Sequence, residues 1–198
     1  MDYKIIPAEK TDSPMIARTI MEALGQELCE SFTHPGRTLQ DVADLFRLCA
    51  EADDSQYSWN NTLKAVDENG NILGMVISYD GAQLHELRKR FLDEFAKQNG
   101  FRIDDRMSDE TDATEWYLDS LAVFPEYRGR GIARSLISAV RERAASSGKP
   151  VGLLVDKTNH RAEGLYDRLG FQTVGDRPFA GELMTHKQIP TNPNFTQN

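Results

Sequence analysis

The apolar positions of the chain follow two periods, and the change between them separates strands from helices. Residues 3–7 form a short apolar stretch, which predicts an opening strand. Apolar residues spaced three and four apart then predict helices that begin at Ser13-Pro14 and at Thr38, where capping residues stand. Two apolar runs flank Asn69-Gly70, a strong hairpin signal, so 61–67 and 72–79 are predicted to pair.

The second half of the chain alternates helical and strand patterns. This order indicates an α/β domain with a mixed central sheet flanked by helices. The predicted elements are a helix over 82–99, an acidic segment over 104–112, a strand over 114–124, a helix from 132 to about 146, a strand over 150–156, a helix over 161–169 closed by Gly170, and two short strands. We predict one domain over 1–188, with 82–113 as an insertion between the third and fourth strands, and a flexible tail over 189–198.

Composition and charge limit the class of protein and the partners that this chain can have. The chain has 198 residues with 39% hydrophobic and 27% charged residues, which is typical of one globular domain. Its net charge of -8 argues against nucleic acid as a partner. No apolar run reaches the length of a membrane span, and no secretory signal is visible, so we expect no membrane partner. Cys29 and Cys49 lack metal-ligand spacing and are predicted to be buried free thiols of a cytoplasmic protein.

The acidic segment allows two interpretations. Asp104, Asp105, Asp109, Glu110 and Asp112 most simply form a solvated loop, which is the usual state of a charge run. The alternative is a charged rim that attracts a cationic substrate. We favour the solvated loop.

An arginine-glycine turn joins the strand over 114–124 to the helix that follows, within the stretch VFPEYRGRGIARSL. A strand, a glycine turn and a helix together expose backbone N–H groups at a helix N-terminus, and the helix dipole favours an anion there. Arg128 and Arg130 add charge-assisted donors. The turn is neither a Walker A motif nor GxGxxG. Its pattern indicates phosphate binding, against the alternative of a helix start with chance glycines.

Residues 128–133 fit the signature R/Q-x-x-G-x-G/A, and here the chain resembles the GCN5-related N-acetyltransferase (GNAT) family. The resemblance continues through LDSLAVFPEYRGRGIARSLI and VGLLVDKTNHRAEGLYDRLGFQTVG, so it covers residues 115–175. The first 80 residues agree with the family only in the order of their elements. Two motifs at the expected separation make the resemblance specific.

The resemblance implies a GNAT-like fold that binds acetyl-CoA. The strand over 115–124 would splay from the strand over 150–156, and the pantetheine arm would lie in the opening. It would pair with backbone groups of Leu121, Ala122 and Val123. The pyrophosphate would be held by Arg128 and by the turn and helix start, namely Gly129, Arg130, Gly131, Ile132 and Ala133.

The resemblance also suggests groups for acetyl transfer. Tyr166, seven residues past Asn159, matches the family's general acid, although it also shares a helix face with apolar residues and could be a core tyrosine. Asn159 would bond CoA, cap its helix, or do both. By family geometry, a backbone N–H near Val123 would stabilise the oxyanion.

The general base is less clear from the sequence. Some protein-modifying family members carry a glutamate at the position that Tyr117 occupies here. This departure leaves Asp119, Glu115 or a chain of waters as candidates. Strand alternation puts Glu115, Tyr117, Asp119, Leu121 and Val123 on one face unless a bulge intervenes. Asp80, at the end of the hairpin, is a further candidate for the wall of the acceptor pocket.

We therefore interpret the chain as an acetyl-CoA-dependent N-acetyltransferase without a metal. It would transfer the acetyl group to a primary amine of a small molecule or peptide by direct attack in a ternary complex. The alternative is a catalytically silent acyl-CoA-binding module of the same fold. A different phosphate ligand is poorly supported, because both nucleotide motifs are absent. Edge strands and the inserted helix offer surfaces for a homodimer.

Overall fold

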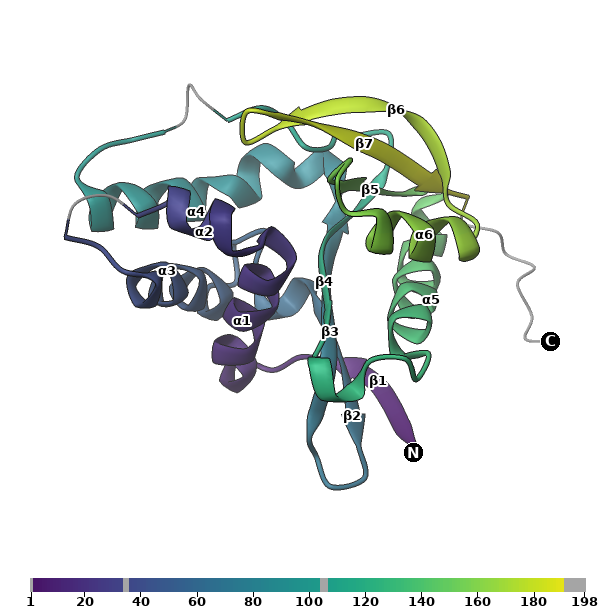
Figure 1. The fold of residues 1–198 in the computed structure, drawn as a ribbon. Helices are drawn as coiled ribbons and strands as arrows, with labels where there is room; N and C mark the ends of the chain where they lie inside the picture. Colours follow the sequence, from purple (N-terminus) through teal and green to yellow (C-terminus); the bar gives the residue numbers. More distant parts are fainter. Residues whose placement is uncertain (1, 34–35, 104–106, 191–198) are drawn as a thin grey trace.

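The structure, a computed structural model, describes residues 2–33, 36–103 and 107–190, and these residues build one mixed sheet of seven strands flanked by helices. Figure 1 shows the sheet running through the middle of the molecule. The strands, in their order across the sheet, are β1 (Tyr3–Pro7), β2 (Thr62–Asp67), β3 (Ile72–Asp80), β4 (Trp116–Val123), β5 (Val151–Val155), β7 (Glu182–Ile189) and β6 (Gln172–Phe179). The predicted α/β fold is confirmed.

The helices form a layer on each side of the sheet. One side carries α1 (Ser13–Leu24), α2 (Gln26–Ser31), α3 (Leu39–Glu51) and α4 (Leu84–Asn99), and the other carries α5 (Ile132–Ala144) and α6 (His160–Arg168) (Figure 1). The sequence pattern predicts all of these except α2, which follows α1 directly. Gly25 at φ 81° breaks the first helix and lets the second begin. No described helix has the length and apolar character needed to cross a membrane.

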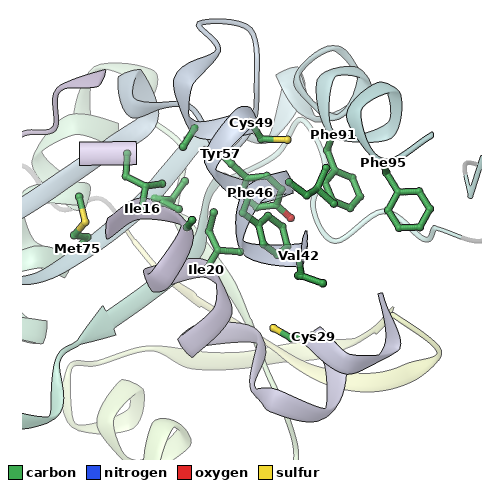
Figure 2. Packing of buried hydrophobic residues seen from close by; sticks show 14 of the residues in the cluster. Ile16, Ile20, Cys29, Val42, Phe46, Cys49, Tyr57, Met75, Phe91 and Phe95 are labelled. Carbon is green, nitrogen blue, oxygen red and sulfur yellow. The ribbon is translucent and has the colours of Figure 1, made fainter. Parts of the chain in front are cut away.

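The core on the α1 side is aromatic (Figure 2). Phe46 of α3 stacks on Phe91 of α4 with ring centroids 6.0 Å apart, and Tyr57 meets both rings edge-on. Cys29 and Cys49 are buried in the same cluster as free thiols, as predicted. Because α4 supplies part of this core, the segment 82–113 is built into the domain. The predicted tail lies outside the described residues from position 191 onward.

Strand β4 is the element on which the site depends. It pairs antiparallel with β3 along its length, but it pairs with the parallel strand β5 only at Trp116 and Tyr117. Beyond Tyr117 the two parallel strands separate. The sheet therefore opens on the β5 side of β4, at the position that the sequence predicts.

A β-bulge interrupts β4 at Asp119. Leu118 pairs with Ser78 and Ser120 pairs with Ile77, so Asp119 faces no partner on β3. The extra residue moves the following side chains to the other face, and Leu121 and Val123 join the core under α5 while Tyr117 contacts Tyr79 on the opposite side. Simple alternation therefore does not put all of these residues on one face, because the bulge, the exception that the prediction allowed, is present.

Candidate functional site

A cavity of about 480 Å³ lies at the opening between β4 and the helices α5 and α6. It is lined by all of the cofactor residues that the sequence suggests except Arg130: Leu121, Ala122, Val123, Arg128, Gly129, Gly131, Ile132, Ala133, Asn159 and Tyr166. Arg130 instead donates through Nη2 to the Glu126 carbonyl and lies over the ring of Tyr127. The structure thus brings two segments, 121–133 and 159–166, around one space.

The arginine-glycine turn leaves room for an anion at the start of α5. Gly129 and Gly131 have φ of 77° and 79°, and a Cβ built on either would meet no atom within 4 Å. Gly131 caps α5 without any side-chain acceptor, so the cap leaves the N–H groups of the first helical turn to other partners. These donors and the positive end of the helix dipole suit a phosphate group.

The free edge of β4 can hold an extended chain. The Phe124 N–H donates to the Leu73 carbonyl at 3.0 Å, so it points toward β3. Backbone groups alternate along a strand, and those of Val123 and Leu121 therefore point toward the opening. Arg128 agrees with this, because its Nε reaches the Val123 carbonyl from that side at 2.8 Å. The edge offers amide-pairing groups next to the turn that suits phosphate.

A second cavity, of about 570 Å³, continues from the first. Leu121, Asn159, Ala162 and Tyr166 line both cavities, so Tyr166 lies where they meet. Its half-buried ring packs edge-on against Phe171 at 5.5 Å. Burial raises the pKa of the Tyr166 phenol to about 12, and the phenol therefore keeps its proton at neutral pH.

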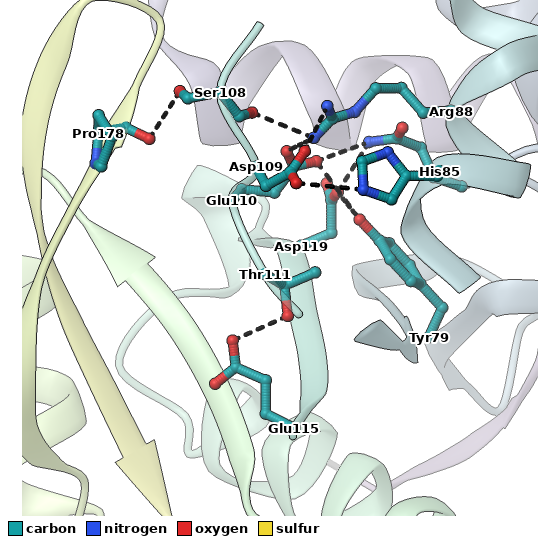
Figure 3. Close-up of polar contacts among 11 residues, drawn as sticks. Tyr79, His85, Arg88, Ser108, Asp109, Glu110, Thr111, Glu115, Asp119 and Pro178 are labelled. Carbon is teal, nitrogen blue, oxygen red and sulfur yellow. Dashed lines mark hydrogen bonds and ion pairs between the residues drawn. The ribbon is translucent and has the colours of Figure 1, made fainter. Parts of the chain in front are cut away.

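Asp119 lines the second cavity from the bulge of β4. Its carboxylate accepts hydrogen bonds from Ser120 Oγ at 2.8 Å, from Gln56 Nε2 at 3.3 Å and from the Tyr79 hydroxyl at 3.3 Å. Figure 3 shows the Tyr79 hydroxyl directed toward Asp119. Burial and the nearby charge of Glu110 raise the pKa of Asp119 to about 7 despite these donors. A carboxylate with this pKa can take a proton from an amine near neutral pH.

Glu110 shows that the acidic segment is not a solvated loop throughout. Its side chain is 2% exposed, accepts from Arg88 of α4, and lines the second cavity. Asp109 pairs with Arg88 and His85, and Asp112 pairs with Arg177 at 2.8 Å. The solvated-loop prediction is therefore wrong at Glu110, whereas Asp104 and Asp105 lie outside the described residues. The acidic sequence alone does not indicate that the buried Arg88 of α4 bonds Glu110.

Glu115 lies apart from both cavities, although it precedes Asp119 by only four residues. It is fully buried and accepts hydrogen bonds at 2.8 Å from Thr111, His186 and Gln188. Burial alone would raise the pKa of Glu115, but these three donors together hold it below its usual value. A Cβ on Gly152 would fall 1.7 Å from the Glu115 carboxylate, so this glycine of β5 leaves the space that Glu115 fills.

Two other predicted positions have structural partners. Asn159 accepts from the Ala162 N–H at 3.1 Å and caps α6, and its place in both cavity walls leaves the CoA contact open as a prediction. Asp80 pairs with Lys149 and is not among the described residues that line either cavity. Among the residues that the structure describes, no group of three or more His, Cys, Asp or Glu side chains could hold a metal ion.

Several residues around Asp119 have no signal in the sequence. Gln56, Tyr79 and Glu110 come from a loop, a hairpin strand and the acidic segment, and each looks like an ordinary polar or core residue in its own stretch. Glu22 of α1 lines both cavities and pairs with Arg128 at 3.2 Å. Only the tertiary fold brings these groups together.

Comparisons with known proteins agree with this geometry. The model of the Acetyltransferase (GNAT) family matches residues 21–171, and the chain belongs to this family. An acetyltransferase of Pectobacterium atrosepticum is 40% identical over 55 residues, which are 27% of this chain and 39% of that protein. The match thus spans about two fifths of that relative.

Solved structures share the fold over almost the whole chain. The crystal structure of an acetyltransferase superposes with a TM-score of 0.75 at 27% identity, covering 96% of this chain and 100% of the other. An N-acetyltransferase from Staphylococcus aureus Mu50 gives a TM-score of 0.77 at 23% identity, with 94% and 100% coverage, and this second likeness shows the fold alone.

Proposed function

We propose that the protein is an acetyl-CoA-dependent N-acetyltransferase that acetylates a primary amine by direct attack in a ternary complex. One observation carries this proposal: two cavities meet at Tyr166, one lined by the anion-binding turn and the other by Asp119. The first suits the pyrophosphate and pantetheine of acetyl-CoA. The second offers an acceptor amine a carboxylate whose pKa is near 7.

The residues divide the chemistry into three parts. Asp119 takes the proton that an ammonium must lose before its nitrogen can attack the thioester carbonyl. A backbone N–H on the free edge of β4, near Val123, stabilises the oxyanion of the tetrahedral intermediate. Tyr166 then gives its proton to the CoA sulfur as the carbon–sulfur bond breaks. Its raised pKa suits this role, because the phenol is a neutral donor at the start of the reaction.

The acceptor cavity favours a positively charged amine. Its lining contains the carboxylates of Glu22, Glu110, Asp119 and Asp156, and none of the described residues in the lining is a lysine, arginine or histidine. A volume of about 570 Å³ suits a small molecule or the end of a peptide. We therefore propose a cationic small-molecule or peptide amine as the acceptor, with no nucleic acid, membrane or metal involved.

Two further features of the proposal concern the whole protein. The buried free thiols Cys29 and Cys49 suit the reducing conditions of the cytoplasm, where we propose that the enzyme acts. A homodimer stays a prediction.

A catalytically silent acyl-CoA-binding module is the second candidate. It is favoured by Tyr117, which packs on Tyr79 at the position where some relatives carry a glutamate. Slow release of free thiol from acetyl-CoA without an acceptor separates the two candidates, because a silent module would not produce it. Acetylation of any member of a panel of amines would decide for the enzyme.

Cofactor binding is tested by thermal unfolding with CoA. A ligand that binds only the folded state stabilises it by RT ln(1 + [L]/Kd), so we expect millimolar CoA to raise the Tm. Gly131→Asp should abolish the shift, because a carboxylate would occupy the anion site. Gly148→Asp is the matched control, since Gly148 also has a positive φ and open space but stands at the other end of α5. A wild-type Tm that CoA leaves unmoved would contradict the proposal.

A further inference from the structure

Asp119 and Glu110 share their hydrogen-bond donors. Gln56 Nε2 lies 3.3 Å from Asp119 Oδ2 and 3.2 Å from Glu110 Oε1. The Tyr79 hydroxyl lies 3.3 Å and 3.5 Å from the same two oxygens. Figure 3 shows the carboxylates of Glu110 and Asp119 close to the Tyr79 hydroxyl. Two carboxylates bridged in this way repel each other when both are ionised, and the pair can relieve the repulsion by holding one proton.

The surroundings decide which carboxylate holds that proton. Arg88, 5% exposed, donates to Glu110 and also to Asp109. The described residues that bond Asp119 are all uncharged, namely Gln56, Tyr79 and Ser120. The guanidinium therefore stabilises Glu110 as the anion, and the proton goes to Asp119.

The other titratable groups around Asp119 do not change which of the two carboxylates holds the proton. Tyr57, Tyr79 and Tyr117 face it from a loop, β3 and β4, and burial raises the pKa of all three phenols well above 10, so they stay neutral. His85 of α4 pairs with Asp109, beyond Glu110. Glu22 and Asp156 also line the cavity and carry the same sign of charge as Glu110.

We propose that Glu110, held by Arg88, is a positioning residue that sets the pH range in which Asp119 accepts the proton of the acceptor amine. This inference rests on the proposed function, in which Asp119 is the base. The segment between α4 and β4 thereby acts on the chemistry through a charge that lies beside the base Asp119. Asp119 changes its protonation state near neutral pH because burial and the anion beside it both disfavour its charged form.

The test measures the titration of Asp119 directly. Carbon-13 NMR of the side-chain carboxyl groups follows each titration, and the Asp119 signal is the one that Asp119→Asn removes. We expect Glu110→Gln to lower the midpoint of the Asp119 titration by about one pH unit, and the low-pH limb of kcat to move with it. Asp112→Asn is the matched control: it removes a carboxylate two residues away that bonds Arg177, and we expect no shift.

A second variant is needed in case the first does not fold. Glu110→Gln leaves the buried positive charge of Arg88 with the Asp109 carboxylate as its only acidic partner among the described residues. Arg88→Gln/Glu110→Gln removes the pair as a unit, and we expect the Asp119 midpoint to fall in this variant also. An Asp119 midpoint that stays in place in both variants would overturn the inference. The proposed function fails differently, by the absence of CoA binding or acetyl transfer, and those results leave the NMR titration intact.

Discussion

Two carboxylates stand four residues apart, Glu115 just before β4 and Asp119 within it, and their surroundings give them opposite properties. Both accept three hydrogen bonds. The donors of Glu115 hold its pKa below its usual value despite its burial, whereas burial and the charge of Glu110 raise the pKa of Asp119 to about 7. Glu115 sits where β4 is still paired with β5, under Gly152. Asp119 sits past that point, on the bulge, and lines the acceptor cavity.

The difference teaches how one strand supplies both structure and chemistry. Where the sheet is closed, the Glu115 carboxylate serves as an acceptor for neighbouring donors, and its bonds to His186 and Gln188 of β7 link the start of β4 to β7 across β5. Where the sheet opens, Asp119 lines a cavity, and there we propose that it meets the acceptor. A carboxylate can therefore serve as a structural anchor or, as we propose for Asp119, as a base, and its pKa separates the two roles.

The first prediction concerns the contribution of Glu115 to stability, and we expect it to show the largest effect. Glu115→Ala leaves His186 and Gln188 without their buried partner, so we expect the free energy of unfolding to fall by about 3 kcal/mol or more. Denaturant unfolding measures this. Glu163→Ala, at a half-exposed carboxylate 3.8 Å from His160, should change it by less than about 0.5 kcal/mol. An equally small loss of unfolding free energy in Glu115→Ala would contradict the structural role of Glu115.

The second prediction tests Tyr166, the proposed general acid, which lines the same cavity as Asp119. Tyr166→Phe removes one hydroxyl and keeps the ring on Phe171, so we expect kcat to fall by roughly 100-fold or more with little change in Tm or CoA affinity. Tyr3→Phe is the matched control, because it removes a hydroxyl that bonds Ser135 at 2.8 Å, away from both cavities. Normal turnover in a less stable Tyr166→Phe variant would identify a core tyrosine instead.

The third prediction concerns the stability cost of a base with a raised pKa. The folded protein keeps the Asp119 proton up to about pH 7, whereas the unfolded chain releases it near pH 4. The folded state therefore binds more protons between these values, and the Asp119 contribution to the free energy of unfolding falls as the pH rises from about 4 to 7.

Asp119→Asn removes this penalty. Relative to wild type, the variant should gain stability as the pH rises, by on the order of 2 kcal/mol at pH 8 for a carboxyl that is partly exposed. Thermal unfolding at pH 5 and pH 8 measures the difference between the two proteins. A stability difference that does not depend on pH would mean that Asp119 titrates normally.

Much of the fold follows from local patterns in the sequence. Capping at Thr38, the Asn69-Gly70 turn and the apolar run at 151–155 each act within a few residues, and the structure confirms all three. The cavity that we propose to hold acetyl-CoA was predictable for the same reason, because the turn at 128–133 and the helix at 160–168 are contiguous motifs.

The acceptor side of the site could not be predicted in this way. Choosing between Asp119 and Glu115 depends on a bulge, on His186 from β7, and on Glu110 held by Arg88. These partners lie 22 to 71 residues apart along the chain, so no local pattern contains them. The burial of Glu110 in an acidic run depends on the same long-range contact.

The pH dependence of kcat for the wild type, Asp119→Asn and Glu115→Gln tests the account most directly, with an amine that the acceptor panel shows to be acetylated. We predict that wild-type kcat rises with pH around a midpoint near 7, the pKa of Asp119. The folded fraction of Glu115→Gln should keep that midpoint. Asp119→Asn should lose it, together with most of the rate at neutral pH. The same midpoint in all three proteins would contradict the assignment of Asp119 and point to deprotonation through water.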